Sequence, residues 1–592
     1  MRVLPQEMVA DAKLLPQEKY FLELWYSMTH MQSLDSYRVR CMNSRTIIRE
    51  LSEELDIGII KENEFKNLCA ETKAILENDP IILHDFPQYW TTIKPYLESP
   101  PSSQKKKTDN ENKEKSQLQY VSSDFFCSLE KAYFEKIIAM LPGSIRPDNG
   151  KDLKVLVDAL IGDLLDRGWP LETLFGWHRH FLVKKPRKDY TFQENLNFML
   201  KVFTSPPIQH QVTLRLQGSN TLGKLNSYGD FSFVESVDVA DSRSRNKFQK
   251  KQGATFAQTI LGEVDALSAA IRGREKFEQL VDLLRFDLEP AKLRIDPRCY
   301  VKRLDNGKED FPAIHASVPN PSEKFGHDEF VAFAQNLDTV CNKSGIEASS
   351  RRQLQAAIRQ YRFGRDSENY NDKFLNWWMG LEALSRVGNG KEIGATVACN
   401  VSRAMAVPYL HRLVRDLATT LKFCRINWPA KLVEVSGCDQ LEKLTLNQLV
   451  TVLQSGEHQL LWDQCEAFPT VCFRGKEIGD ILSDPKKTAG RMKSHLQHLE
   501  WHLERLYRIR CCIVHGAPVR FRLGLLAANL EYYLKQVILL VLNTFRSSDH
   551  VGSLAEFFDR ASFAYDRAIK ELDGGDAGVE EVRSTVNLGF VL

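Results

Sequence analysis

An arginine and a histidine five residues apart make the stretch Trp501–Pro518 the part of this sequence best suited to chemistry. In WHLERLYRIRCCIVHGAP, Arg510 and His515 stand at the predicted end of an amphipathic helix, which Gly516 terminates. Arginine stays charged and holds a phosphate through two parallel hydrogen bonds. Histidine exchanges protons near neutral pH, and a helix C-terminus favours its protonated form. This pair suits RNA cleavage without a metal ion, and it also fits an ordinary helix end.

The spacing of the pair constrains how it acts. Five residues of a regular helix correspond to about 500° of rotation, so the side chains of Arg510 and His515 point about 140° apart. They do not converge on one atom of a straight helix. Either the helix distorts or ends between them, or both side chains face a groove shared with a second copy of the chain.

Two other patterns carry weaker signals. GSNTLGK at 218–224 matches most of a phosphate-binding P-loop, but Leu225 replaces the Ser or Thr that holds Mg²⁺, so a hairpin loop is favoured. His495, His498 and His502 share one helix face, which permits a metal site. A solvated or interfacial polar face beside a leucine stripe is the favoured interpretation. We therefore expect no metal and no other cofactor.

Composition bounds the class of protein. A chain of 592 residues is expected to form two to four domains, and a net charge of +2 predicts that any nucleic-acid affinity comes from local basic patches. The twelve cysteines show no disulfide or zinc spacing, which suits a reducing cytosol. The N-terminus lacks the apolar core of a signal peptide. The longest apolar run, Val537–Leu542, is too short to span a membrane. These features predict a soluble cytoplasmic protein.

Periodicity predicts a multidomain, mainly α architecture. Apolar residues recur at helical spacing in most of the chain, whereas HQVTLRLQG and DFSFVESVDVA alternate as half-buried strands do. A helix is predicted from about 254 to 274, with strands around 292–295 and 300–303. The predicted segments are a helical 1–98, a polar linker at 99–118, a helical 119–205, a mixed α/β region at 206–345, an all-α bundle at 346–548 and a tail with one helix at 549–592.

The C-terminal half is predicted to be almost entirely helical. A capping-box pattern opens a helix at Ser350. This helix carries arginines on or near one face: Arg351, Arg352, Arg359, Arg362 and Arg365. They are candidate RNA contacts, with a solvated face as the alternative. Further helices are predicted at 374–386, 393–406, 408–423, 445–454, 487–512, 523–545 and 554–572.

Four of these segments, taken in order, resemble a known family. DKFLNWWMGLEALSR, IGATVACNVSRAM, LYRIRCCIVHGAP and LAANLEYYLKQVILLVLNTF are similar to core helices of the HEPN superfamily, particularly its Apea-like group. The resemblance covers about residues 346–548. It implies an all-α domain that dimerises, or forms a higher homo-oligomer, and cuts RNA without metal in a cleft between protomers.

The resemblance also assigns residues. Arg510 and His515 take the family's catalytic positions, and Glu382 matches the acidic residue of its first core helix. Cys511 stands where active members often carry Asn, Asp or His. Large proteins of this superfamily often act in bacterial defence against phage, which implies an abortive-infection endoribonuclease with residues 1–345 sensing a phage-derived or nucleic-acid trigger. The alternative is a non-catalytic HEPN scaffold that dimerises and binds nucleic acid or a partner.

Overall fold

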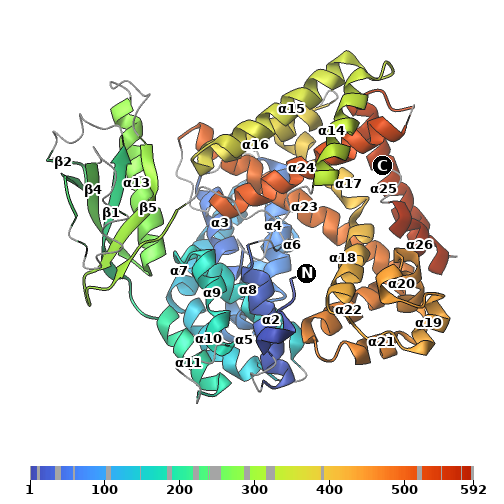
Figure 1. The fold of residues 1–592 in the computed structure, drawn as a ribbon, viewed down its shortest axis with the longest axis horizontal. Helices are drawn as coiled ribbons and strands as arrows, with labels where there is room; N and C mark the ends of the chain where they lie inside the picture. Colours follow the sequence, from blue (N-terminus) through green and yellow to red (C-terminus); the bar gives the residue numbers. More distant parts are fainter. Residues whose placement is uncertain are drawn as a thin grey trace. The chain divides into compact units, whose positions relative to one another are not determined.

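A computed structural model shows a mainly helical chain with one small antiparallel sheet, as the sequence predicts (Figure 1). It describes residues 2–588, apart from 10–13, 32, 34–41, 58–59, 102–108, 147–148, 183–189, 218–225, 238, 240–247, 249–254, 286–293, 315–326, 388–391, 517–522, 549 and 575–576. The chain forms two compact units. Unit 1 comprises 1–163, 181–188 and 318–592, and unit 2 comprises 164–180 and 189–317.

The N-terminal part of unit 1 is helical, as predicted. Its helices are α1 (Gln6–Val9), α2 (Pro16–Thr29), α3 (Ser44–Ile57), α4 (Glu62–Leu76), α5 (Pro80–Asp85), α6 (Pro87–Glu98), α7 (Asp109–Ser144) and most of α8 (Gly150–Asp166). The polar linker predicted at 99–118 is wrong in its second half, because α7 already begins at Asp109. Leu118 is fully buried there, so a helix that starts in polar residues continues directly into the core.

The C-terminal part of unit 1 is all helical. Its helices are α14 (His327–Asn342), α15 (Ala348–Asp366), α16 (Tyr370–Ser385), α17 (Ile393–Ala406), α18 (Tyr409–Phe423), α19 (Ala430–Ser436), α20 (Leu446–Gln454), α21 (His458–Gln464), α22 (Pro469–Leu482), α23 (Pro485–Val514), α24 (Leu523–Ser547), α25 (Leu554–Leu572) and α26 (Val579–Asn587), with a 3₁₀ turn at Leu441–Lys443. The bounds predicted for α17 and α25 are confirmed to the residue. The helices α19, α21, α22 and α26 were not predicted. The prediction of one helix at 549–592 is wrong, because α25 and α26 both lie there.

Two apolar cores stabilise this half. The first lies among α16, α17, α23, α24 and α25 and includes the buried Trp377 and Trp378. The second lies among α18, α20, α22 and α26 around Trp462, and Val3 from the N-terminus joins it. In Figure 1 the blue helices α3 and α4 lie beside the orange α23 and α24 within the same unit. The N-terminal helices therefore form part of the body that holds the C-terminal bundle.

Helix α24 is the one described helix long and apolar enough to cross a membrane, with 72% of its apolar window buried inside the protein. That burial is typical of the core helix of a soluble protein. The sequence pattern alone had indicated no such helix, because Glu531 and Lys535 interrupt its apolar stretch.

Unit 2 contains α9 (Leu171–Gly176), α11 (Phe192–Phe203) and the sheet, while α10 (His178–Leu182) crosses the boundary between the units. The strands are β1 (Ile208–Gln217), β2 (Ser227–Tyr228), β3 (Phe231–Val234), β4 (Thr255–Glu263), β5 (Arg294–Arg303) and β6 (Glu309–Asp310), in the order β2-β3-β4-β1-β5-β6. Helix α13 (Ala266–Arg285) covers one face, packing on Val212 and Leu214 of β1.

Two predictions in this region need correction. The helix predicted at about 254–274 is strand β4 over its first half, because Thr255–Glu263 pairs with β1, and α13 begins only after Asp265. β1 is buried on both faces rather than half-buried. Arg215 points to the second face, is 5% exposed and donates from Nη2 to Asp296 over 2.5 Å. An ion pair thus fills a position where alternation predicts solvent.

Candidate functional site

The predicted end of the arginine–histidine helix is confirmed. Helix α23 continues to Val514 and has His515 as its C-cap, with φ −97° and ψ 8°. Gly516 follows with a φ of +71°, in the left-handed region that glycine adopts without strain. The helix therefore does not break between Arg510 and His515, and it ends at the histidine itself.

Arg510 lies four residues before the last residue of this helix, and His515 is its C-cap. Arg510 is half-buried and His515 is exposed, and neither side chain has a hydrogen bond or ion pair within the described part of the chain. The uninterrupted helix preserves the angular separation of about 140° between the two positions. One chain thus presents a cation and an imidazole on different sides of one helix end.

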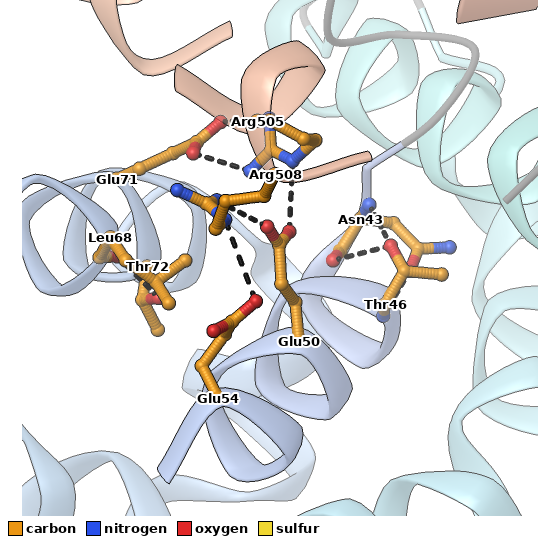
Figure 2. A network of polar contacts seen from close by, with 9 residues as sticks. All are labelled: Asn43, Thr46, Glu50, Glu54, Leu68, Glu71, Thr72, Arg505 and Arg508. Atoms are coloured by element: carbon orange, nitrogen blue, oxygen red, sulfur yellow. Dashed lines mark hydrogen bonds and ion pairs between the residues drawn. The ribbon is translucent and has the colours of Figure 1, made fainter. Parts of the chain in front are cut away.

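The other two arginines of this segment are in the opposite situation. Arg505 donates from Nε to Glu50 over 2.8 Å, and from Nη1 and Nη2 to the two oxygens of Glu71 over 3.1 and 2.5 Å (Figure 2). Arg508 donates from Nη2 to Glu50 over 2.5 Å and has Glu54 3.5 Å from its Nε. The side chains of Arg505 and Arg508 are 2% and 12% exposed. Carboxylates of α3 and α4 therefore neutralise both.

The pKa values in this cluster follow from burial and charge. Burial opposes ionisation of Glu50, but the two guanidiniums outweigh it and lower the pKa of Glu50. Burial opposes the charge of Arg505, but Glu50 and Glu71 outweigh it and raise the pKa of Arg505. Burial raises the pKa of Glu54, which has only the longer contact to Arg508. Glu50 is thus the carboxylate that the arginines hold most firmly in its charged form.

Glu504 lies beside this cluster as a weakly compensated carboxyl. It is 7% exposed, and its Oε1 accepts from Asn67 of α4 over 2.9 Å. Its Oε2 has no hydrogen-bond partner in the described structure. Burial raises its pKa to about 7, since Asn67 and Arg508 offset only part of the desolvation and Glu64 adds repulsion.

Glu382, the third predicted catalytic residue, is held by its own helix. Its carboxylate accepts from Trp378 Nε1 over 3.2 Å and pairs with Arg386 at 3.5 Å, and its side chain is 18% exposed. The ring of Trp378 lies 5.6 Å from that of Tyr507 on α23. Glu382 is thus connected to the helix of Arg510 through Trp378, and its direct contacts are those of a structural residue.

Tyr507 sits three residues before Arg510 and is fixed by close packing. A Cβ atom on Gly394 of α17 would lie 2.3 Å from its ring, so only glycine fits there. Burial raises the pKa of Tyr507, and the neighbouring Cys511 raises it further, while Arg510 lowers it. Tyr507 therefore packs between α17 and Trp378, next to the candidate site.

The predicted RNA-contacting arginines lie on α15. Arg352, Arg359 and Arg362 are exposed, and positions 0, +7 and +10 fall within about 80° on a helix. The guanidinium of Arg362 lies over the Phe363 ring at 5.1 Å. Arg351 is half-buried and donates to the carbonyl of Cys341 over 3.2 Å. Three of the five predicted side chains thus form one exposed basic stripe. Arg351 faces the helix end of α14, and Arg365 is exposed but lies about 140° from Arg352 around the helix.

The side chains of His495, His498 and His502 on α23 contact different neighbours. His495 stacks on Tyr409 at 3.7 Å, and His502 pairs through Nδ1 with Tyr533 at 2.9 Å. Burial lowers the pKa of His495 and of His502 far below the ordinary value. His498 packs on Trp501 at 5.1 Å. No group of three metal-binding side chains occurs among the described residues. The P-loop-like segment at 218–224 lies outside them.

The sequence did not reveal the carboxylates that face α23. Glu50 lies next to the buried Ile47 and Leu51 in RTIIRELSEEL, and Glu71 lies in α4 next to Thr72. An acidic residue bordering an apolar helix stripe is the signal that marks them. Which arginines they meet depends on tertiary packing.

Compared with protein-family models, with curated proteins and with solved structures, this chain has no match.

Proposed function

We propose that this protein is an endoribonuclease that cleaves RNA by transesterification, using Arg510 and His515. One observation carries the proposal. At the end of α23, two arginines are neutralised by buried carboxylates, whereas Arg510 and the exposed His515 have no such partner in the described structure. A charged arginine without a carboxylate partner is suited to binding a phosphate, and an exposed imidazole at the same helix end is suited to proton transfer.

In the proposed reaction the ribose 2′-oxygen attacks the adjacent phosphorus and the bond from phosphorus to the 5′-oxygen breaks. His515 accepts the 2′-hydroxyl proton and returns it to the leaving 5′-oxygen. Arg510 binds the phosphate oxygens and offsets the charge of the pentacoordinate state. The products are a 2′,3′-cyclic phosphate and a 5′-hydroxyl end, and no redox step or external reactant is needed.

The exposed stripe of Arg352, Arg359 and Arg362 supports RNA as the substrate, because phosphate contacts from clustered arginines position a strand without selecting its sequence. The resemblance to HEPN proteins adds a homodimer to the proposal. A shared cleft brings together side chains that lie about 140° apart on one helix. We place the enzyme as a regulated effector of bacterial anti-phage defence that arrests growth when triggered.

The test is cleavage of a labelled RNA in excess EDTA by the wild type, Arg510→Ala and His515→Ala. We expect metal-free cleavage with a cyclic phosphate end, and a fall in kcat of about 10² or more in each variant. His498→Ala, on the same helix but packed on Trp501, is the control and should retain activity. Cleavage that survives His515→Ala removes the assignment. Dimerisation and RNA binding without cleavage support a scaffold instead.

A matching test in cells uses growth. Expression or triggering of the wild type is expected to stop growth, and Arg510→Ala is expected to relieve the arrest at equal protein level. Equal toxicity of the variant contradicts the effector role.

A further inference from the structure

Three arginines lie near the C-terminal end of α23, and they differ in what neutralises them. Arg505 and Arg508 meet carboxylates from α3 and α4, and Arg510 meets none in the described part of the chain. We propose that these carboxylates, with Glu50 at their centre, are positioning residues that select Arg510 as the guanidinium offered to the RNA phosphate. The inference rests on the proposed function and concerns the same site.

Glu50 contacts α23 at two successive turns. Its Oε2 accepts from Arg505 over 2.8 Å and its Oε1 from Arg508 over 2.5 Å, so both oxygens are engaged by residues three apart on the helix (Figure 2). A single carboxylate that bridges two turns fixes the rotation of a helix and its position along its axis. The two hydrogen bonds from Arg505 to Glu71 attach the same helix to α4 as well.

The fixed rotation determines where Arg510 points. On a regular helix Arg510 lies about 140° from Arg505 and about 160° from Arg508, which themselves differ by about 60°. Since Arg505 and Arg508 both face α3 and α4, Arg510 is held on the side turned away from them. The Tyr507 ring, packed against Gly394 and Trp378, restrains the same turn from the side of α16 and α17.

The chemistry of the guanidinium group, like the geometry of the helix, requires that one arginine be selected for the phosphate. Carboxylate and phosphate oxygens compete for the same planar guanidinium edge. With Glu50 and Glu71 in place, each of the three guanidinium nitrogens of Arg505 already donates to a carboxylate, and its side chain is 2% exposed. An unmasked Arg508 would bind a phosphate about 160° around the helix from Arg510, away from the proposed site. The carboxylates therefore prevent unproductive binding at the site.

These contacts are polar, which fits a selective role. The apolar core around α16, α23 and α24 draws none of its described members from α3 or α4. Across this contact the described interactions also include the hydrogen bond from Asn67 of α4 to Glu504 of α23, at 2.9 Å. Ion pairs and hydrogen bonds thus join α3 and α4 to this end of α23.

The decisive experiment compares the same substitution at two arginines of one helix. RNA with a 2′-O-methyl group at each nucleotide cannot be cleaved, and its affinity for the full chain is measured over a range of salt concentrations. Arg510→Met is expected to lower the slope of log K against log salt by about one, the signature of one lost phosphate contact. Arg508→Met is expected to leave the slope unchanged, and a loss of about one there overturns the proposal.

Glu50→Gln tests the selection directly through steady-state cleavage. Unmasking Arg508 should lower KM and lower kcat together, by about ten-fold in kcat, because RNA then binds tightly in an unproductive register. A fall in kcat that matches the loss of folded protein with unchanged KM, or a rise in kcat, overturns the proposal. Asp56→Asn is the control on the same helix and should leave kcat and KM unchanged, since Asp56 is exposed and its described contact is with Gln119, at 2.6 Å.

Two further outcomes separate this inference from the proposed function. If Glu50→Gln does not fold, the two arginine variants in the otherwise native chain still decide the case. If the wild-type chain does not cleave RNA while only Arg510→Met loses a phosphate contact, the nuclease proposal fails and the selection of Arg510 stands.

Discussion

Arg505 shows how strongly one residue can depend on partners from distant parts of the sequence. It is among the largest fully buried side chains, and its charge persists at any pH at which the protein folds. Its neutralising partners lie 434 and 455 residues earlier in the chain. Transfer of an ion pair from water is costly, so the pair is stable only while all its hydrogen bonds are made.

Arg505→Met is therefore expected to destabilise the protein by about 3–5 kcal/mol, because Glu50 and Glu71 then remain buried without a cation. Arg567→Met is the matched control. Arg567 pairs with Glu571 at 2.7 Å on the surface of α25, with its side chain 68% exposed, so its loss should leave the free energy of unfolding nearly unchanged. Urea unfolding of both variants measures the difference, and equal costs would show that burial does not decide the strength of the pair.

Glu504 makes the stability of the folded protein depend on pH. Its folded-state pKa of about 7 lies above its ordinary value of 4.5, so its contribution to stability is complete below 4.5 and is lost as pH rises through about 7. Glu504→Gln removes that loss and keeps an acceptor for Asn67. We expect the variant to gain up to about 3 kcal/mol over the wild type at pH 8, with the difference closing towards pH 4.5.

The measurement is the free energy of unfolding of both proteins in urea at intervals between pH 4.5 and 8. Glu434→Gln, at an exposed position of α19, is the control and should leave the pH profile unchanged. A constant difference between Glu504→Gln and the wild type at all pH values would contradict the assignment of the shift to this carboxyl.

At the scale of elements, α15 combines a structural face and an exposed basic face. Its buried side packs closely on α16, where a Cβ on Gly364 would lie 2.4 Å from the Trp377 ring nitrogen. Tyr361 donates to Glu531 of α24 over 2.7 Å. The helix is thus fixed in the bundle, and its arginine stripe is presented by a rigid support rather than by a mobile loop.

Replacing Arg352, Arg359 and Arg362 with Gln is expected to weaken RNA binding and to reduce the salt slope by up to about three. Arg560, Arg567 and Lys570 on α25 provide an unusually close control, because they are exposed cations with the same +7 and +3 spacing. Filter binding of uncleavable RNA at several salt concentrations compares the two triple variants. Equal losses would mean that overall charge, and not α15, attracts RNA.

At the scale of the whole molecule, the division into two compact units indicates which part of the chain is available to sense a trigger. The predicted sensor at 1–345 does not correspond to one compact unit. Helices α3 and α4 belong with α23 in unit 1, whereas α9, α11 and the sheet form unit 2. We therefore assign the sensing role, as a proposal, to unit 2, because the N-terminal helices are already engaged in holding the candidate site.

A homodimer with a shared cleft predicts complementation between inactive chains. Arg510→Ala and His515→Ala chains, co-expressed with different affinity tags and purified through both, should regain part of the cleavage that neither has alone. Regain is expected because each mixed cleft contains one intact Arg510 and one intact His515. Light scattering confirms the oligomeric state. A mixed dimer without activity contradicts the shared cleft and leaves each chain with a site of its own.

Local patterning was sufficient to predict many of the elements. Gly516 ends α23 as predicted, and the spacing of apolar residues predicts α17 and α25 to the residue, whereas α23 begins at Pro485, two residues before its predicted start. These features depend on residues within a turn or two of each other, so the sequence determines them directly. The same local pattern failed at Thr255–Glu263, where pairing with β1 outweighs a helical interpretation.

Only the tertiary structure decided which of the three arginines in LERLYRIR are paired with carboxylates. Arg505, Arg508 and Arg510 have similar local surroundings, and any of them could bind a phosphate as far as the sequence shows. Packing of α3 and α4 surrounds two of them with carboxylates and leaves Arg510 near the helix end. The physical reason is that a guanidinium's charge is set by its type, whereas its availability depends on partners that folding brings from more than 400 residues away.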